Sequence, residues 1–272
     1  MLTADAARCA GHGIRSRLTA SSVRLAARWT PYVETELLGL RSLVGLGSVC
    51  LDIGAAAGLY TLMLSQLAGR EGRVHSVEPL PFAHPVWTRL LRARDAGNVR
   101  HHPVALSAEP GSSVMSVPLG RYGPVTGRSF VTDGSSGLGS NAEFAGHMAV
   151  DVSVDTLDGL CARAGVTRLD FVKVDVEGAE LRVLEGGRQT IESLRPALLI
   201  EIEARHTARY GYSPSDITGW LLQRGYTMHI WRHGWQQASQ VCPHTRNYLF
   251  RPQAPARPLD AELSPAGEAA ER

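Results

Sequence analysis

The most informative stretch of the chain reads Leu169-Asp-Phe-Val-Lys-Val-Asp-Val-Glu-Gly-Ala-Glu180. Its first six residues predict a buried strand, and the pattern that follows predicts a helix over residues 177–185. Because side chains alternate along a strand, the valines point to one face and Phe171, Lys173 and Asp175 point to the other. A lysine and a carboxylate are costly to bury on an apolar strand unless they are paired. We therefore expect a functional site at the carboxyl end of this strand.

Lys173 is the only lysine among the 28 basic residues of the chain. We expect its ammonium group to neutralise Asp52 or Asp175 across adjacent strands, inside the site, and so to serve catalysis. The alternative is a lysine whose aliphatic stem lies along the sheet while its charge reaches solvent at the sheet edge. The two interpretations differ in the burial of the ammonium group.

The composition is that of an ordinary globular protein. Of the 272 residues, 44% are hydrophobic and 20% are charged. A net charge of +2 predicts no nucleic-acid partner, and the lack of an apolar run of about 18 residues predicts no membrane span. The four cysteines, at positions 9, 50, 161 and 242, form no paired motif and predict free thiols in a reducing compartment. We therefore expect a cytoplasmic enzyme.

Strand and helix patterns alternate on both sides of the opening stretch. Further strands are predicted at residues 48–53, 73–77, 99–106, 150–154 and 196–202. Further helices are predicted at residues 34–46, 59–67, in a segment that ends near Ala96, and at 156–164 and 214–224. This alternation is typical of a parallel sheet covered by helices on both faces, which is an α/β fold. Residues 227–231 and 247–250 predict a terminal antiparallel pair, so that one antiparallel strand joins the sheet.

We expect one domain over residues 34–251. Residues 1–33 are predicted to be helical or partly disordered, and residues 252–272, rich in Pro, Ala and Glu, to form a disordered tail. Residues 107–148 interrupt the alternation with many Gly, Ser and Pro residues, which is typical of a functional insertion or a cover. Within this insertion, residues 113–117 and 128–131 are candidate hairpin strands.

A glycine-containing turn follows the strand at 48–53 and reads Asp52-Ile-Gly-Ala-Ala-Ala-Gly58. Glycines permit a tight turn and let a ligand approach the backbone and the N-terminus of the next helix. The spacing is not that of the dinucleotide or nucleoside-triphosphate motifs, and Asp52 inside the turn favours a ligand that carries a positive group. Glu78 ends the next strand, where a carboxylate can accept both hydroxyl groups of a ribose. Together these features predict binding of S-adenosyl-L-methionine.

Five motifs carry a wider resemblance: Val49-Cys-Leu-Asp-Ile-Gly-Ala-Ala-Ala-Gly-Leu-Tyr-Thr61, Val77-Glu-Pro-Leu-Pro81, Asn98 to Ser107, Thr156-Leu-Asp158 and Phe171-Val-Lys-Val-Asp-Val-Glu-Gly-Ala-Glu180. Over residues 34–250 the chain resembles the FkbM-type S-adenosylmethionine-dependent methyltransferases. The resemblance implies the class I methyltransferase fold, a Rossmann-like, doubly wound, seven-stranded and mostly parallel sheet whose last strand is antiparallel. It also implies O-methylation of a hydroxyl group on a sugar, a glycan or a polyketide-type metabolite. The chain has Ala56 where the family usually has asparagine, which implies the loss of a polar contact near the cofactor.

The predicted donor site consists of Asp52, Gly54, Ala56, Gly58, Glu78 and Ser107. Asp52 is expected to bind the ammonium group of the donor's amino-acid end, directly or through water. Gly54 and Gly58 are expected to admit the ligand to the backbone, and Glu78 to hold the ribose. Ser107, at the end of the third strand, is expected near the adenine, and a solvated loop hydroxyl is the alternative.

Asp175 is the main candidate on the acceptor side, because open α/β sheets bind ligands at the carboxyl ends of their strands. Its carboxylate could orient the acceptor hydroxyl, act as a base, or help bind a divalent metal with Glu177 and Glu201. The sequence favours the first two roles, and no metal is predicted. Glu177 and Glu180 are also explained as first-turn charges of the following helix. His206 is a candidate proton acceptor near neutral pH, with a structural histidine as the alternative.

Two other functions compete with the methyltransferase. A nucleotide-dependent oxidoreductase would need a dinucleotide motif, which the turn at 54–58 lacks. A catalytically impaired protein that binds a nucleotide or S-adenosylmethionine on the same fold is the other alternative, and Ala56 favours it. The acceptor is not determined by the fold class, because specificity resides in the site and in the insertion at 107–148.

Overall fold

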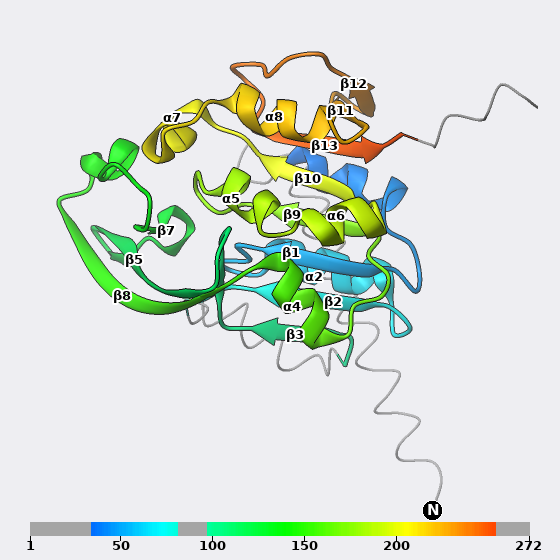
Figure 1. The fold of residues 1–272 in the computed structure, drawn as a ribbon, viewed down its shortest axis with the longest axis horizontal. Helices are drawn as coiled ribbons and strands as arrows, with labels where there is room; N and C mark the ends of the chain where they lie inside the picture. The colour runs from blue at the N-terminus through cyan, green and yellow to red at the C-terminus, as the bar shows by residue number, and fades with distance from the viewer. Residues whose placement is uncertain (1–33, 81–96, 254–272) are drawn as a thin grey trace, which may run out of the picture.

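The computed structural model describes residues 34–80 and 97–253. Within them, eight strands form one sheet at the centre of the molecule, in the order β12-β11-β13-β10-β9-β1-β2-β3 (Figure 1). The strands are β1 (Val49–Ile53), β2 (Arg73–Val77), β3 (Val99–His102), β9 (Phe171–Val174), β10 (Ala197–Glu201), β11 (Tyr226–Trp231), β12 (Trp235–Gln237) and β13 (Asn247–Pro252).

The sheet has the predicted topology. Five neighbouring strands, β10, β9, β1, β2 and β3, pair in parallel. Strand β13 runs antiparallel to both β10 and β11. Seven strands were expected, and β12 adds a short eighth strand that pairs with β11. From β1 the chain proceeds outward to β2 and β3 and then returns to β9 on the other side of β1. Ligands of open α/β sheets bind at such a reversal of strand order.

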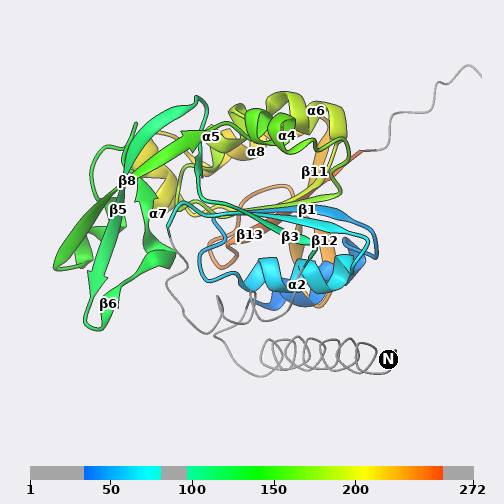
Figure 2. The same ribbon diagram turned by 90° about the horizontal axis from the view of Figure 1, so that it is seen from below.

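Helices cover both faces of the sheet (Figure 2). One face packs against α2 (Leu59–Ala68) and the 3-10 helix η1 (Thr35–Ser42). The other packs against α4 (Leu157–Ala164), α5 (Glu180–Glu185), α6 (Arg188–Leu194) and α8 (Pro214–Leu222). The predicted alternation along β9 is confirmed. Phe171 belongs to the hydrophobic core under α2 and η1, whereas Val172 and Val174 belong to the core under α4, α5, α6 and α8. Lys173, which alternates with the valines, therefore faces α2.

A second, smaller sheet lies at the carboxyl ends of the parallel strands (Figure 1). Its order is β4-β8-β5-β6, with β7 paired to β5. The candidate hairpin strands 113–117 and 128–131 do pair, through Met115 with Val131 and Ser116 with Phe130. The elements are β4 (Ala105–Leu106), β5 (Gly111–Gly120), β6 (Gly123–Pro124), the 3-10 helix η2 (Thr126–Arg128), β7 (Phe130–Val131), the 3-10 helix η3 (Gly139–Glu143) and β8 (Gly146–Asp155).

Several predicted boundaries were wrong. The strand predicted at 99–106 is divided into β3 and β4, which belong to different sheets, because Pro103 lacks the N–H that a continuous ladder needs. The strand predicted at 150–154 is the end of the longer β8. The helix predicted from residue 177 begins at Glu180, and Glu177 adopts a left-handed turn conformation (φ +57°). Glu177 is therefore not a first-turn charge of this helix. Thr156 does cap α4, since its hydroxyl accepts a hydrogen bond from the Gly159 N–H.

Three predicted segments lie outside the described residues: the N-terminal segment 1–33, the helix that ends near Ala96, and the tail beyond residue 253. Strand β13 reaches Pro252, the first residue of the predicted tail. None of the helices in the described ranges combines the length and the hydrophobicity that a membrane crossing requires.

Candidate active site

A pocket opens at the carboxyl ends of β1, β2 and β9, where the second sheet meets the first. Its empty volume, which includes the solvent-open mouth, is about 690 Å³. The main sheet contributes Gly54, Ala56, Glu78, Asp175 and Glu177 to its lining, and the second sheet contributes Met115, Ser129 and Val131 among others. The pocket therefore joins the predicted donor turn to the predicted acceptor-side carboxylate.

The turn after β1 has a left-handed backbone at Gly54 (φ +77°), Ala56 (φ +43°) and Gly58 (φ +80°). A Cβ atom on Gly54 would overlap the carbonyl oxygen of Asp175. Glycine therefore allows the turn to pack directly against the end of β9. Ala56 carries its Cβ in a conformation that costs a residue other than glycine about 1–2 kcal/mol.

Glu78 lies in the pocket lining and already holds the donor turn. One oxygen of its carboxylate accepts a hydrogen bond from the Ala56 N–H (2.9 Å), and the other accepts one from the Leu80 N–H (2.9 Å). Burial raises the pKa of Glu78 to about 7, although both hydrogen bonds lower it. A carboxylate has about four acceptor positions, so each oxygen retains a lone pair that could receive a ribose hydroxyl.

Asp52 lies on the α2 side of the sheet and is 1% exposed. The Thr61 hydroxyl donates to its carboxylate at 2.5 Å and also lies 3.0 Å from the Ser76 hydroxyl. Burial raises the pKa of Asp52 to about 6. In the described residues the Asp52 side chain thus bonds α2 to β1 beneath the donor turn, whereas Glu78 is in the pocket lining.

Ser107 follows β4 and is buried, which excludes the solvated-hydroxyl alternative. Its N–H donates to the Asp155 carbonyl (2.9 Å), and its own carbonyl packs so closely against Gly186 that a Cβ there would overlap it. Its neighbours Ala105 and Leu106 line the pocket. The structure therefore brings the backbone before Ser107, more than its hydroxyl, to the pocket.

Lys173 is fully buried, which excludes the surface alternative. Its Nζ lies 3.1 Å from Asp175 Oδ2 and donates a hydrogen bond to Asn247 Oδ1 (2.9 Å). The Tyr60 ring lies beneath the same ammonium group, 5.1 Å from its centroid. Of the two predicted partners, the structure selects Asp175, which directly follows the strand of Lys173 and is not on an adjacent one. Asp52, opposite Lys173 in the β1–β9 register, bonds to Thr61 instead.

Lys173 determines the ionisation of Asp175. Burial by itself would raise the pKa of Asp175, but the adjacent ammonium and a hydrogen bond from Glu201 hold it below its ordinary value. The pKa of Lys173 is raised in return: burial opposes its charge, but Asp175 and other nearby carboxylates outweigh that effect. Among the carboxylates that line the pocket, Asp175 is therefore the one whose pKa is lowered, and its side chain is 27% exposed.

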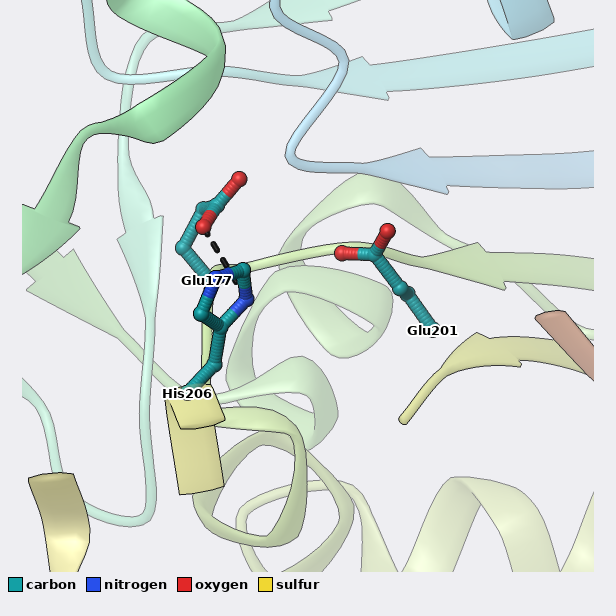
Figure 3. A group of neighbouring side chains, drawn as sticks. All are labelled: Glu177, Glu201 and His206. Carbon is teal, nitrogen blue, oxygen red and sulfur yellow. Dashed lines mark ion pairs between the residues drawn. The ribbon is translucent and has the colours of Figure 1, made fainter. Parts of the chain in front are cut away.

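Glu177, Glu201 and His206 form a buried group beside Asp175 (Figure 3). Glu201 ends β10, and His206 lies on α7 (Ala204–Thr207), which the 3-10 helix η4 (Ala208–Tyr210) follows. His206 Nδ1 is 3.1 Å from Glu177 Oε2. Burial raises the pKa of Glu177 to about 8 and raises that of Glu201, where Asp175 adds to the effect.

His206 does not have the neutral-range pKa that its predicted role requires. It is 2% exposed, and burial lowers its pKa below the usual range. At neutral pH its ring is therefore uncharged and a weak base. Gly178 explains the burial, since a Cβ at this residue would overlap the His206 carbonyl, so glycine lets the turn after β9 pack against α7.

The sequence analysis did not identify several partners of these groups. Asn247 and Tyr60 bind Lys173, and Thr61 binds Asp52. Arg128, from the second sheet, lies 3.8 Å from Glu177 Oε2, and Arg209 donates to the Glu177 carbonyl (3.2 Å). These residues carry no motif of their own. Tyr60 and Thr61 were within a quoted motif, as part of the donor turn and its helix.

Comparison with known proteins agrees with this geometry. The Methyltransferase FkbM domain family matches residues 52–228, from the end of β1 into β11. The chain belongs to the FkbM methyltransferase family. The matched region of this FkbM methyltransferase includes the donor turn and every candidate side chain through His206.

The individual proteins to which the chain is similar are distant from it in sequence. "Methyltransferase sdnD" of Sordaria araneosa is 30% identical over 156 residues, which are 50% of this chain and 58% of that protein. The chain therefore spans less than two thirds of that relative. A Methyltransferase FkbM structure from Methylobacillus flagellatus KT is 17% identical, covers 75% of this chain and 44% of its own, and has a TM-score of 0.44. Fibrillarin from Aeropyrum pernix, with bound S-adenosyl-L-methionine, is 16% identical, covers 80% and 74%, and has a TM-score of 0.42.

Proposed function

We propose that this methyltransferase transfers the methyl group of S-adenosyl-L-methionine to a hydroxyl oxygen of a sugar, a glycan or a polyketide-type small molecule. One observation carries the proposal: the Lys173–Asp175 pair, at 3.1 Å, keeps an ionised carboxylate in the pocket that also contains the donor turn. An ionised carboxylate accepts hydrogen bonds only. It therefore selects an acceptor that has a proton to donate, as a hydroxyl group does.

The same pocket supports a position for the donor. Glu78 supports a bound ribose through its free lone pairs, and Gly54 and Ala56 leave the turn open to the rest of the donor. Because Gly54 packs on the Asp175 backbone, the donor turn and the acceptor-side carboxylate are adjacent. Fixing the two reactants in contact supplies much of the rate enhancement in a displacement of this kind.

The reaction needs little from the protein besides alignment. The acceptor oxygen attacks the methyl carbon, the carbon–sulfur bond breaks with its electron pair going to sulfur, and the hydroxyl proton leaves the oxygen. We propose that Asp175 orients the hydroxyl through its proton and receives or relays that proton as the new bond forms. The lowered pKa of Asp175 favours orientation over strong basicity.

The second sheet supports a small acceptor. Met115 and Val131 give the pocket an apolar side, and Ser129 and the η2 segment give it polar groups. This mixture suits a hydroxylated ring with one apolar surface. We propose that the reaction takes place in the cytoplasm, which the free thiols of Cys50, Cys161 and Cys242 support.

Donor binding and methyl transfer test the proposal separately. Calorimetry should detect binding of S-adenosylmethionine and of its demethylated product. Mass spectrometry should then detect methylated products in a panel of glycosides and hydroxylated polyketides, with amine and thiol analogues included. Asp175→Asn should reduce kcat by about a hundredfold or more while donor affinity remains unchanged. Asp133→Asn, an exposed carboxylate paired with Arg182, is the matched control and should retain activity.

Three results would count against the proposal. Failure of both donor forms to bind would refute donor use at this pocket. Transfer only to nitrogen or sulfur acceptors would refute the hydroxyl assignment. Donor binding without transfer to any acceptor would favour the impaired binding protein that Ala56 makes conceivable.

A further inference from the structure

Three side chains that could bind a metal ion converge beside the pocket (Figure 3). Glu177 comes from the turn after β9, Glu201 from the end of β10, and His206 from α7. One potential ligand atom from each lies within 4.8 Å of the others. Figure 3 shows both carboxylate groups and the imidazole ring turned toward a common space. All three residues are buried, so the group is not an exposed acidic surface.

The group has unsatisfied polar atoms. Among the described residues, Nε2 of His206 is buried and has no hydrogen-bond partner. Oε2 of Glu177 is also buried and makes no hydrogen bond, although it has ion-pair contacts with His206 Nδ1 at 3.1 Å and Arg128 Nε at 3.8 Å. Buried polar atoms without partners are rare in proteins and need an explanation such as an ion or a water. An uncharged imidazole is the form that binds metals.

The nearby cations are shared with other groups, and Arg209 donates to the Glu177 carbonyl and not to its carboxylate. Lys173 is held by Asp175 and Asn247, and its charge therefore balances Asp175. Arg128 also contacts Glu143 (3.3 Å) and Asn141 (3.1 Å) on η3. Glu34, Asp175 and Glu201 form a second group whose ligand atoms lie within 4.8 Å, and it shares Glu201 with the first. The described part of the site thus has an excess of carboxylates over cations.

We infer that Glu177, Glu201 and His206 bind a divalent cation of the first transition row, of the Mn²⁺ type, at the wall of the pocket. Carboxylate oxygens together with an imidazole suit Mn²⁺ and its neighbours, whereas Mg²⁺ favours oxygen ligands and retained water. Because Glu177 lines the pocket next to Asp175, the cation is adjacent to the expected position of the acceptor hydroxyl. Its part in orienting an acceptor oxygen rests on the proposed function, but its binding does not.

Binding is tested without donor or acceptor. The full chain is freed of metal with EDTA and titrated with MnCl₂, and unbound Mn²⁺ is measured by electron paramagnetic resonance. The expected result is one Mn²⁺ per chain and a rise in Tm on binding. Glu201→Gln and His206→Gln should each weaken Mn²⁺ binding by at least about tenfold, as losses of ligating groups do. Glu203→Gln is the matched control, because this nearby carboxylate accepts from Arg205 (2.6 Å) and is outside the group.

The possible outcomes separate the inference from the proposed function. Absence of saturable binding of Mn²⁺ and of Zn²⁺ to folded protein would overturn the site, as would equal affinity in all variants. If Glu201→Gln shows no cooperative melting transition, Glu177→Gln replaces it and must show the same loss of binding. Methyl transfer that persists fully in EDTA, in protein that binds Mn²⁺, would overturn the cation's part in the reaction and leave the proposed function intact. Failure of the protein to bind S-adenosylmethionine, while it binds Mn²⁺, would count against the proposed function alone.

Discussion

Replacing Lys173 by methionine tests the central electrostatic argument. Methionine keeps most of the aliphatic stem and removes the ammonium group that lies 3.1 Å from Asp175 and 2.9 Å from Asn247. Removing one partner of a buried ion pair costs about 3–5 kcal/mol, because the other charge remains buried without compensation. Asp175 is 27% exposed, so solvent compensates in part, and we expect a loss near 3 kcal/mol in the free energy of unfolding.

The loss should depend on pH in a defined direction. In the wild type, the pKa of Asp175 is below its unfolded value, so its stabilising contribution is present above the unfolded pKa and is lost as pH falls through the folded pKa. Without Lys173, burial should raise the pKa of Asp175 above its unfolded value. In the variant, the contribution of Asp175 to the free energy of unfolding is then greatest at low pH and is lost as pH rises through the raised pKa. The stability difference between wild type and variant should therefore be larger at about pH 8 than at about pH 5.

Urea denaturation at these two pH values measures the difference, and calorimetry and methyl transfer are measured on the same samples. Donor affinity should change little, because Glu78 and the donor turn are untouched, whereas kcat should fall by about tenfold or more as Asp175 becomes protonated. The double variant Lys173→Met/Asp175→Asn should recover much of the lost stability, which gives the coupling energy of the pair. The reasoning would be refuted by a single variant with wild-type stability at both pH values and full activity.

Three further predictions concern the donor turn and can be checked with purified variants. Ala56→Gly should raise the free energy of unfolding by about 1 kcal/mol, because Ala56 has φ +43°; an unchanged or lower Tm would contradict this. Gly54→Ala should be severely destabilising, by about 3 kcal/mol or more, since its Cβ would overlap the Asp175 carbonyl; a wild-type urea midpoint would show that the turn can move. Glu78→Gln should weaken donor binding by about tenfold in calorimetry. Because burial raises the pKa of Glu78 to about 7, wild-type affinity should rise from about pH 6 to about pH 8 as the carboxylate ionises, and equal affinities at both pH values would argue against a ribose contact.

Much of the fold follows from local sequence properties. The alternation of Phe171, Val172 and Val174 predicted which residues of β9 share a face of the sheet, because side-chain direction in a strand depends on position. The Thr156 cap of α4 is also a local contact, since the Thr156 hydroxyl bonds an N–H three residues away. Residues 99–106 were predicted as one strand, although Pro103 has no N–H with which to continue a ladder. The structure divides them into β3 and β4 at this residue.

The donor motifs and the position of Asp175 were likewise predictable. Glycine turns after a first strand, an acid after the second and an acid after a central strand all lie at carboxyl ends, and parallel strands bring those ends to one edge of the sheet. The pocket that contains Gly54, Glu78 and Asp175 follows from this topology.

Only the tertiary structure decided what the charged side chains contact. The partner of Lys173 could have been Asp52 or Asp175; in the structure Lys173 pairs with Asp175 and also donates to Asn247, which is 74 positions away in the chain. The burial of His206 depends on packing against Gly178, and the position of Glu177 on a left-handed turn between the two sheets. Hydrogen bonds and desolvation act over a few ångströms in space and regardless of sequence separation. The residue pattern therefore determined the sheet and the edge at which the site forms, and the packing of distant segments determined the protonation and the pairing of the groups within it.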